Sequence, residues 1–333
     1  MLAERRGGTL LEMRAIRLTS LDGPEGLEVA ELPKPEDSRR LVVEVRAAGV
    51  GFPDLLMTRG RYQFRPDPPF VPGIEMAGVV QSAPEGTGFM PGDRVTAWSA
   101  LGCWAEYALA APATTFKIPD DMSFAKATTL VNYQSAYFGL VERGAAQAGE
   151  TVLIHGAAGG VGSAAVDVAG AMGLTPIAIA RGEAKLAVAR NLGAQHCLDA
   201  DSEWLDEVRG ITGGGVDLVF DPVGGERFLD SVRALTTGGR LLVVGFAGGS
   251  IPEVKVNRFL LRNTTLVGVA WGEFVRHDLE MPQRIGRRLA ELWEAKKIDP
   301  LVGPTFPLER AADALSEIES RRAIGKVVLT VRD

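Results

Sequence analysis

The hydrophobic positions follow one pattern in the first third of the chain and another in the middle. From Met13 onward, apolar residues alternate with polar ones in the runs RAIRLT, GLEVAEL and RLVVEVRAAGV, which glycines and prolines separate. Alternation with a period of two is typical of strands with one buried face. A short helix over FPDLLMTRG, a loop over 62–75 and strands around 76–81, 93–98 and 105–110 would complete a β-rich first part.

At about residue 123 the pattern changes to buried strands that alternate with helices. TVLIHG is a continuous apolar run, typical of a parallel strand covered on both faces. Small and apolar residues at helical spacing follow it in GVGSAAVDVAGAMG. The alternation then continues through PIAIA, GEAKLAVARNLG, GVDLVF, GERFLDSVRAL and RLLVVGF. Strands and helices in this order predict a parallel sheet with right-handed crossovers.

The last part of the chain predicts one more strand, two helices and a closing strand. The strand is TTLVGVAW, the helical patterns cover 276–297 and 308–320, and the closing strand is KVVLTV. The parallel unit therefore lies inside the chain, and we expect the tail to return to the first domain.

Composition narrows the class of protein. The chain has 333 residues, 46% of them hydrophobic, which is enough for two domains with cores of their own. A net charge of −6 argues against a nucleic-acid partner, and two cysteines are too few for a disulfide framework. No apolar run reaches the roughly 18–20 residues of a membrane helix. Residues 1–12 lack a signal-peptide core and are expected to be a disordered extension, so we expect a cytoplasmic protein without a membrane partner.

A glycine-rich turn after TVLIHG is the first chemical signal. AAGGVG (157–162) joins that strand to a helix, the setting in which G-x-G-x-x-G binds a dinucleotide. Ala157 takes the place of the first glycine, and Gly159 and Gly162 those of the second and third. Gly159 would let the backbone approach a pyrophosphate, which the free N–H groups of the helix attract. A purely structural tight turn is the alternative.

The end of the next strand bears on the choice of cofactor. Sites for NAD place an acid about 20 residues further on, against the ribose 2′-hydroxyl. Here Arg181 follows PIAIA, and Lys185 lies one helical turn later. A guanidinium binds a 2′-phosphate bidentately, so the sequence favours NADPH. Glu183 argues against NADPH unless it belongs to the first turn of its helix, where an acid is favoured by the helix dipole. The alternative to a phosphate site is that Arg181 and Lys185 are simply solvated.

HGAAGGVG, followed by this Arg and Lys, resembles the quinone oxidoreductase (zeta-crystallin-like) branch of the medium-chain dehydrogenase/reductase superfamily. Other matching motifs are AGVGFPD, RGRY, PFVPGIEMAG, PGDRV, AEY, DPVGG and GKVVL. The resemblance implies an α/β protein with a GroES-like catalytic domain over 13–123 and 271–333. A Rossmann NADPH-binding domain over 124–270 interrupts it, and the active site would lie in the cleft between the two.

The resemblance also implies that no metal is bound. The alcohol dehydrogenase relatives bind catalytic zinc through a Cys at the place of Gly51 and a His at the place of Ile74. Neither Gly nor Ile has a ligand atom on its side chain. The four-cysteine structural zinc loop is missing too, and Cys103 and Cys197 cannot replace it. Glu75 remains, with a structural partner role as the simpler interpretation.

By the same resemblance, several residues are expected to contact the cofactor. Ser135 and the stretch Gly245–Phe246 would lie near the nicotinamide, and Arg321, or its neighbour Arg322, would reach the 2′-phosphate. The remaining expected contacts lie in the glycine turn and the tail motif: Ala158, Gly159, Gly160, Val161, Gly162 and Lys326. The chain departs from the family at Gly51, where many members have Asn, and near Ala200, where some have Tyr.

Four residues are candidates for the substrate pocket: Phe52, Tyr62, Trp271 and Phe274. Tyr62 can donate a hydrogen bond and is the catalytic candidate, with a packing role as the alternative. Trp271 and Phe274 would form an apolar wall for a flat substrate, or else interdomain core.

Two function classes follow. The first is an NADPH-dependent reductase that passes a hydride to a small quinone or α,β-unsaturated carbonyl compound. The second is a redox-silent NADPH-binding structural or RNA-associated protein of the zeta-crystallin type. An apolar edge strand invites pairing, and the family pairs there, so we expect a homodimer joined through TTLVGVAW.

Overall fold

The computed structural model describes residues 11–332, which pack into two compact units. Among the described residues, the first unit contains 11–128 and two later stretches, Thr305–Ser320 and 328–332. The second unit contains the other two stretches, Thr129–Pro304 and Arg321–Val327. The chain therefore passes from one unit to the other more than once, as the expected return of the tail requires.

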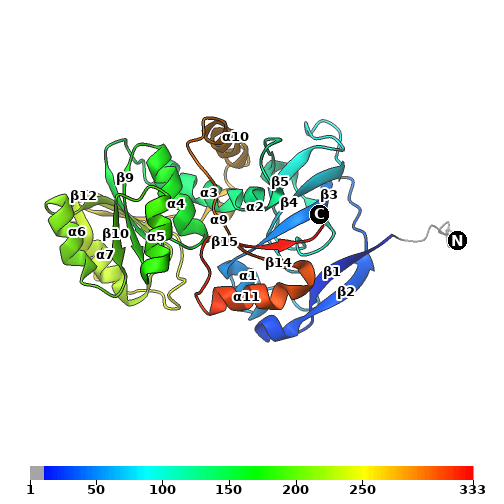
Figure 1. The fold of residues 1–333 in the computed structure, drawn as a ribbon, viewed down its shortest axis with the longest axis horizontal. Helices are drawn as coiled ribbons and strands as arrows, with labels where there is room; N and C mark the ends of the chain where they lie inside the picture. Colours follow the sequence, from blue (N-terminus) through cyan, green and yellow to red (C-terminus); the bar gives the residue numbers. More distant parts are fainter. Residues whose placement is uncertain (1–10, 333) are drawn as a thin grey trace. The chain divides into compact units, whose positions relative to one another are not determined.

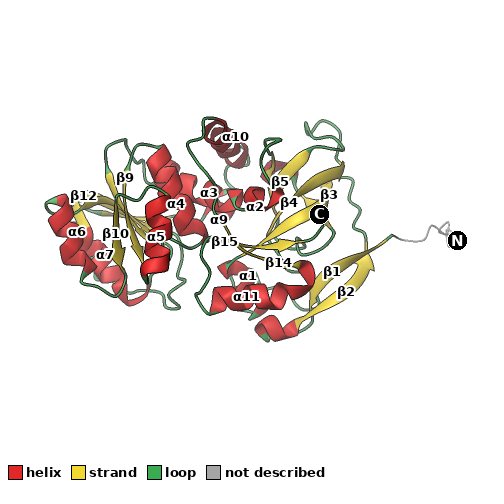
Figure 2. Cartoon of the chain, viewed as in Figure 1, coloured by secondary structure: helices red, strands yellow, loops and turns green. Residues whose placement is uncertain are grey.

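The first unit is built on antiparallel strands (Figures 1 and 2). β1 and β2 form a two-stranded sheet, and a seven-stranded sheet has the order β14-β15-β3-β4-β5-β7, with β6 also paired to β3. The strands are β1 (Glu12–Leu18), β2 (Leu27–Pro33), β3 (Leu41–Val50), β4 (Glu75–Ser82), β5 (Arg94–Trp98), β6 (Tyr107–Ala110), β7 (Thr115–Lys117), β14 (Val302–Pro307) and β15 (Lys326–Thr330). The helices are α1 (Phe52–Thr58), α2 (Phe124–Thr128) and α11 (Ala311–Glu319). Of the extension expected over 1–12, residues 1–10 lie outside the described residues, and β1 begins at Glu12.

The second unit is a six-stranded parallel sheet in the order β10-β9-β8-β11-β12-β13. Its strands are β8 (Thr151–His155), β9 (Thr175–Ala180), β10 (His196–Asp199), β11 (Val216–Asp221), β12 (Leu235–Val243) and β13 (Thr265–Gly268). Its helices are α3 (Leu130–Tyr137), the π-helix η3 (Phe138–Arg143), α4 (Gly160–Ala171), α5 (Glu183–Asn191), α6 (Trp204–Thr212), α7 (Phe228–Ala234), α8 (Asn257–Leu260), α9 (Trp271–Phe274) and α10 (Met281–Glu294). Helices cover both faces of this sheet (Figure 2), which explains why its central strands are buried along almost their whole length.

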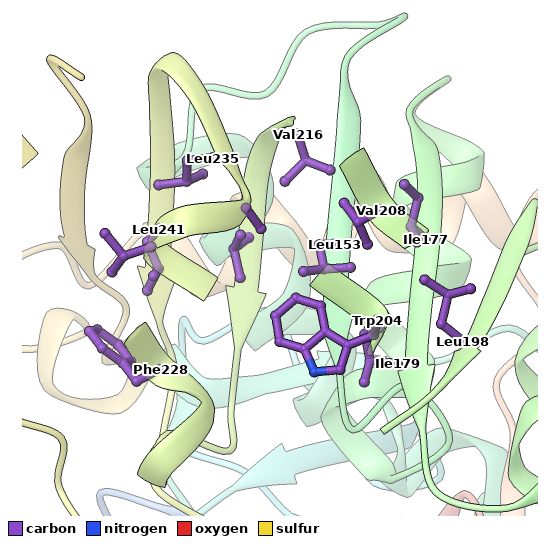
Figure 3. Packing of buried hydrophobic residues seen from close by; sticks show 13 residues of the cluster. Leu153, Ile177, Ile179, Leu198, Trp204, Val208, Val216, Phe228, Leu235 and Leu241 are labelled. Atoms are coloured by element: carbon purple, nitrogen blue, oxygen red, sulfur yellow. The ribbon is translucent and has the colours of Figure 1, made fainter. Parts of the chain in front are cut away.

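Side chains from the sheet and from α6 and α7 form one of the cores of the second unit (Figure 3). Leu153 of β8 is fully buried there, together with Trp204 and Phe228 from the two helices. Trp204 also meets the ring of His155 edge to face, with centroids 5.2 Å apart. This packing fixes the carboxyl ends of β8, β9 and β11, from which the candidate site is built.

The unit boundaries differ from those expected from the sequence. The first crossing falls after Thr128 rather than after residue 123, because α2 packs against β3 and β4. The helices α9 and α10 belong to the second unit, where the Gln134 side-chain amide donates a hydrogen bond of 3.0 Å to the carbonyl of Pro282. The predicted strand TTLVGVAW is also shorter than expected, since β13 ends at Gly268 and Trp271 begins α9.

Sequence patterns missed the strands β7, β10 and β14 and the helices α2, α3, α6, α8 and α9. These strands have three to six residues, too few for a period of two to stand out. Within residues 11–332, no helix has both the length and the apolar character that crossing a bilayer would require.

Candidate dinucleotide-binding site

The turn between β8 and α4 has the geometry of a phosphate-binding loop. Gly156 adopts a positive φ of 61°, so the left-handed position of the turn comes one residue before Ala157. A Cβ on Gly162 would lie 2.1 Å from the carbonyl oxygen of Gly156, so only glycine allows α4 to start this close to the strand. A Cβ on Gly159 would have no neighbour nearer than 3.4 Å, which leaves room beside the backbone at that position. The first N–H groups of α4 are thus available to an anion.

The tail of the chain is attached directly to this turn. The N–H of Gly325 donates a hydrogen bond of 2.8 Å to the carbonyl of Ala158, and Gly159 and Gly325 form a parallel bridge. Lys326, the next residue, is only 4% exposed, although it carries an ammonium group. The tail motif around Gly325 and Lys326 is therefore attached to the glycine turn, and a cofactor contact by its residues stays a prediction.

Asn132 of α3 is a neighbour of the turn that the sequence did not indicate. A Cβ on Gly160 would lie 3.0 Å from the Asn132 side-chain nitrogen and 3.8 Å from Cδ of Lys326. Gly160 therefore sits in a narrow space between an amide and a lysine, both able to donate hydrogen bonds. Ser135, one helical turn after Asn132, is half-buried, and its hydroxyl donates to the Val131 carbonyl at 3.3 Å.

Positive side chains gather where β9 and β10 end. Arg181 binds Asp201 through two hydrogen bonds, Nε to Oδ2 at 2.8 Å and a terminal nitrogen to Oδ1 at 3.0 Å. Arg227, which follows β11, donates to the same Oδ1 at 2.6 Å. The two guanidiniums lower the pKa of the Asp201 carboxyl by hydrogen bonding to it. We call Arg181, Asp201 and Arg227 the arginine–aspartate cluster.

Lys185 and Arg321 lie beside this cluster. The Lys185 ammonium donates to the carbonyl of Arg321 at 2.5 Å, and the Arg321 guanidinium donates to the carbonyl of Gly248 at 3.2 Å. Burial lowers the pKa of Lys185, and the positive charge of Arg181 lowers it further. The structure thus brings Lys185 near Arg181 and into contact with the backbone of Arg321, while the Arg321 guanidinium is directed to Gly248. Glu183 begins α5 and pairs with Arg190 at 3.2 Å, which leaves it out of the cluster.

The loop after β12 carries the two residues expected along the nicotinamide, Gly245 and Phe246. It is held to the loop after β11, since the N–H of Val244 donates to the Asp221 carbonyl at 2.9 Å. The Asp221 carboxylate is buried and accepts hydrogen bonds from the N–H groups of Val223 and Gly224 at 2.8 and 2.9 Å. Both loops are therefore fixed before any ligand arrives.

Trp271 and Phe274 lie in the same short helix, α9, and differ in exposure. Trp271 is 4% exposed and packs inside the second unit, whereas Phe274 is half-buried. The Phe274 ring lies 5.1 Å from that of Phe138 at the start of the π-helix η3, and the Arg143 guanidinium lies over it at 5.9 Å. The structure therefore exposes more of Phe274 than of Trp271 to a flat ligand.

Phe52 and Tyr62 belong to the first unit. Phe52 begins α1, which Asp54 caps by accepting a hydrogen bond of 2.8 Å from the N–H of Gly51. Tyr62 is half-buried in the following loop, where its carbonyl accepts a hydrogen bond from Arg65 at 3.0 Å. That these residues line a pocket in a cleft between the domains stays a prediction.

The two positions expected for zinc ligands are also in the first unit. Gly51 precedes α1, and Ile74 is 7% exposed. Burial raises the pKa of the Cys103 thiol well above its usual range, and the charges of Asp54 and Glu75 raise it further. Residues 11–332 contain no group of three or more His, Cys, Asp or Glu side chains arranged to hold a metal ion. That the protein binds no zinc stays a prediction.

Comparisons with known proteins identify the family. A family described as "Alcohol dehydrogenase GroES-like domain" matches residues 37–120, and one described as "Zinc-binding dehydrogenase" matches residues 160–285. Quinone oxidoreductase-like protein 2 of Mus musculus is 36% identical over 327 residues, which cover 96% of this chain and 92% of that protein. The chain belongs to the quinone oxidoreductase branch of the medium-chain dehydrogenase/reductase superfamily. The predicted α/β fold, with a GroES-like and a Rossmann domain, is confirmed.

Solved structures of this superfamily match over nearly the whole chain. A probable oxidoreductase from Mycobacterium abscessus is 43% identical, with a TM-score of 0.90, and the match covers 97% of this chain and 100% of that one. The quinone oxidoreductase of Thermus thermophilus, solved also in complex with NADPH, is 34% identical with a TM-score of 0.81, covering 96% and 100% of the two chains.

Sequence reasoning missed Asp201 and Arg227, although both belong to the cluster. Asp201 follows β10, a strand of four residues that the periodicity did not reveal. Arg227 comes from a segment 46 positions after Arg181, and no local pattern joins the two. The run LDAD (198–201), whose first two residues end β10, was the available signal for Asp201.

Proposed function

We propose that the protein is an NADPH-dependent reductase that passes a hydride to a small quinone or enone without the help of a metal. The observation that carries the proposal is that Arg181 and Lys185 lie at the end of β9 and the start of α5, which pack against the glycine turn at Ala158, and that Lys185 is bonded to the tail at Arg321. The NADPH complex of the Thermus thermophilus relative supports the choice of cofactor.

The residues of the second unit fit NADPH. The N–H groups at the start of α4 would bind the pyrophosphate, helped by the helix dipole. Arg181 and Lys185 would bind the 2′-phosphate, which carries up to about two negative charges. Gly245, Phe246 and Ser135 would border the nicotinamide. NADPH, when bound, supplies the hydride that reduces the substrate.

The residues at the two zinc positions decide which substrates suit this site. Oxidising an alcohol requires loss of the hydroxyl proton, and zinc lowers the pKa of bound water by about nine units, to about 7. That is roughly 12 kcal/mol, at about 1.36 kcal/mol per unit. Gly51 and Ile74 supply no ligand for such an ion. A quinone or conjugated enone is already electron-poor, so a hydrogen-bond donor such as the Tyr62 hydroxyl suffices for the oxygen that gains charge.

The experiment that tests this function is NADPH oxidation with a panel of small quinones and enones, and with ethanol as the alcohol control in the reverse direction. We expect turnover of at least one quinone or enone and no ethanol oxidation, in protein without stoichiometric zinc by elemental analysis. Tyr62→Phe should slow turnover by less than about a hundredfold, because one oxyanion donor is typically worth about 10²–10³ and water can replace it. Tight NADPH binding with inertness toward the whole panel would instead favour a redox-silent binding protein.

A further inference from the structure

Asp201 occupies an unusual place for a carboxylate in a site for a phosphate. Its two oxygens accept three hydrogen bonds from Arg181 and Arg227, and its side chain is still 53% exposed. The Arg181 side chain is 62% exposed and that of Arg227 is 33% exposed. The cluster is therefore held by ion pairs that water can reach, and these exchange readily because exposed pairs contribute little free energy.

The charges around Asp201 leave the cluster positive. Asp199, the other acid at the end of β10, accepts hydrogen bonds from the N–H groups of Gly182 and Asp201 at 3.0 and 2.8 Å. Against these two carboxylates stand Arg181, Arg227 and the nearby Lys185. A phosphate with up to about two negative charges neutralises these positive side chains better than the single charge of the Asp201 carboxylate does. Both guanidiniums also have the planar, forked arrangement of N–H groups that fits phosphate oxygens.

We propose that Asp201 stands in for the cofactor's 2′-phosphate in the free protein, and that Arg227 is a further ligand of that phosphate. This inference rests on the proposed use of NADPH. Asp201 holds the two guanidiniums close together and competes with the phosphate for them. When the phosphate binds, Arg181 and Arg227 exchange the carboxylate for phosphate oxygens, and the exposed Asp201 side chain turns to solvent.

The position of Asp201 argues against another role, in which its carboxylate would accept hydrogen bonds from the ribose hydroxyls of NADH. In NAD sites that acid ends the second strand of the sheet, after the glycine motif. Arg181 holds this place here, directly after β9, and Asp201 follows β10, the edge strand beyond it. Asp201 therefore reaches the site only through its bonds to the arginines.

Binding of 2′,5′-ADP and of 5′-AMP, measured by calorimetry, isolates the contribution of the 2′-phosphate without any turnover. We expect Arg227→Gln to weaken 2′,5′-ADP binding about tenfold, the scale of one charged hydrogen bond, and to leave 5′-AMP binding unchanged. Asp201→Asn should tighten 2′,5′-ADP binding by about threefold to tenfold, because the arginines lose their competing partner. Arg190→Gln is the matched control, since Arg190 is an exposed arginine of α5 that pairs with Glu183 outside the cluster.

The outcomes separate the two proposals. If the unmodified protein binds both nucleotides equally, the use of NADPH itself is wrong. If it prefers 2′,5′-ADP but Arg227→Gln behaves like Arg190→Gln, or Asp201→Asn does not tighten binding, the stand-in role is wrong and the NADPH proposal stands. NADPH and NADH titrations of the same variants, followed by protein fluorescence, should show the same changes in the ratio of the two affinities.

Discussion

At Gly162 the absence of a side chain decides how closely α4 approaches the turn after β8. A Cβ there would lie 2.1 Å from the carbonyl oxygen and 2.6 Å from the carbonyl carbon of Gly156. Both atoms are backbone, so no rotamer change can relieve the contact. At Gly170, near the end of the same helix, a Cβ would meet no atom within 4 Å.

Gly162→Ala should therefore displace the start of α4, cost about 1–3 kcal/mol of unfolding free energy and weaken NADPH binding. Gly170→Ala, the control, should keep NADPH affinity and gain up to about 1 kcal/mol, because alanine favours helix over glycine. Urea unfolding and fluorescence titration with NADPH measure both effects. Equal behaviour of the two variants would show that the close approach has no role in the site.

The residues of this turn also show what the sequence can and cannot predict. The roles of Gly159 and Gly162 are predictable because the motif is local and the backbone geometry at each position requires a glycine. The left-handed position at Gly156 was not assigned, since φ cannot be deduced from a motif in which Ala157 replaces the first glycine. Arg227 was beyond reach because its partner is set by tertiary structure alone.

His155, at the end of β8, makes the stability of the protein depend on pH. Burial lowers the pKa of its imidazole, the Asp221 charge opposes this, and the Arg227 charge adds to it. Its Nε2 lies 2.8 Å from the Ser231 hydroxyl. Because the pKa of His155 is lower in the folded protein than in the unfolded chain, the unfolded chain binds the proton more readily as the pH falls below about 6.5. The contribution is thus fully present above that pH and is lost as the pH falls below it.

His155→Gln should remove this dependence, which amounts to at most about 1.4 kcal/mol per pH unit. The measurement is the difference in unfolding free energy between variant and unmodified protein from about pH 5 to 7.5. Burial raises the pKa of Asp167, so the contribution of Asp167 to stability falls as the pH rises, opposite to that of His155. Asp167 is present in both proteins, so its contribution cancels when their unfolding free energies are subtracted. His277→Gln, at an exposed histidine, should keep the slope. A slope that persists in His155→Gln would contradict the assignment.

At the scale of elements, the attachment of the tail to the glycine turn is the contact that matters most for the site. Gly325 has a φ of 72°, and its added Cβ would lie 3.0 Å from Cγ of Leu301 and 3.1 Å from the nitrogen of Gly303. The sequence predicted the parallel sheet and the closing strand from periodicity, but not this bridge, which joins residues 166 positions apart. Strand pairing over such a distance leaves no periodic signal.

Gly325→Ala should loosen the tail from the turn. The variant should lose unfolding free energy for two reasons. The left-handed backbone costs an alanine about 1–2 kcal/mol, and the close contacts of its Cβ cost about 1–3 kcal/mol more. Gly213→Ala is the matched control, because Gly213 has a φ of 71° but open space around its Cβ position. We expect the control to lose stability only and to keep its NADPH affinity, while Gly325→Ala loses both. Thermal unfolding measures the stability of both variants, and NADPH titration measures their affinity for the cofactor. Unchanged NADPH affinity in Gly325→Ala would show that the tail does not support the site.

At the scale of the whole molecule, the sheet of the second unit has two edge strands, β10 and β13. β13 is the last strand in the order and pairs with β12 on one side. Leu266 on this strand is 46% exposed. Large apolar side chains that precede β13 in the sequence are more exposed still: Ile251, Val256, Leu260 and Leu261. An edge strand with an exposed leucine favours pairing with another chain, and so do exposed apolar side chains in the segment that leads into it.

We propose that the β13 edge joins two copies of the chain, because an isologous contact between two β13 strands covers this edge in both copies and ends the assembly at a dimer. Light scattering at micromolar concentration should give about twice the 35.4 kDa of one chain. Leu261→Asp, at a side chain 76% exposed, should shift the mass to that of a monomer, since a buried unpaired carboxylate costs several kcal/mol. Met90→Asp is the control, because Met90 is 61% exposed in the first unit and should leave the dimer intact. If the unmodified protein is a monomer, the proposed dimer does not form. If Leu261→Asp stays dimeric, the interface lies on another surface.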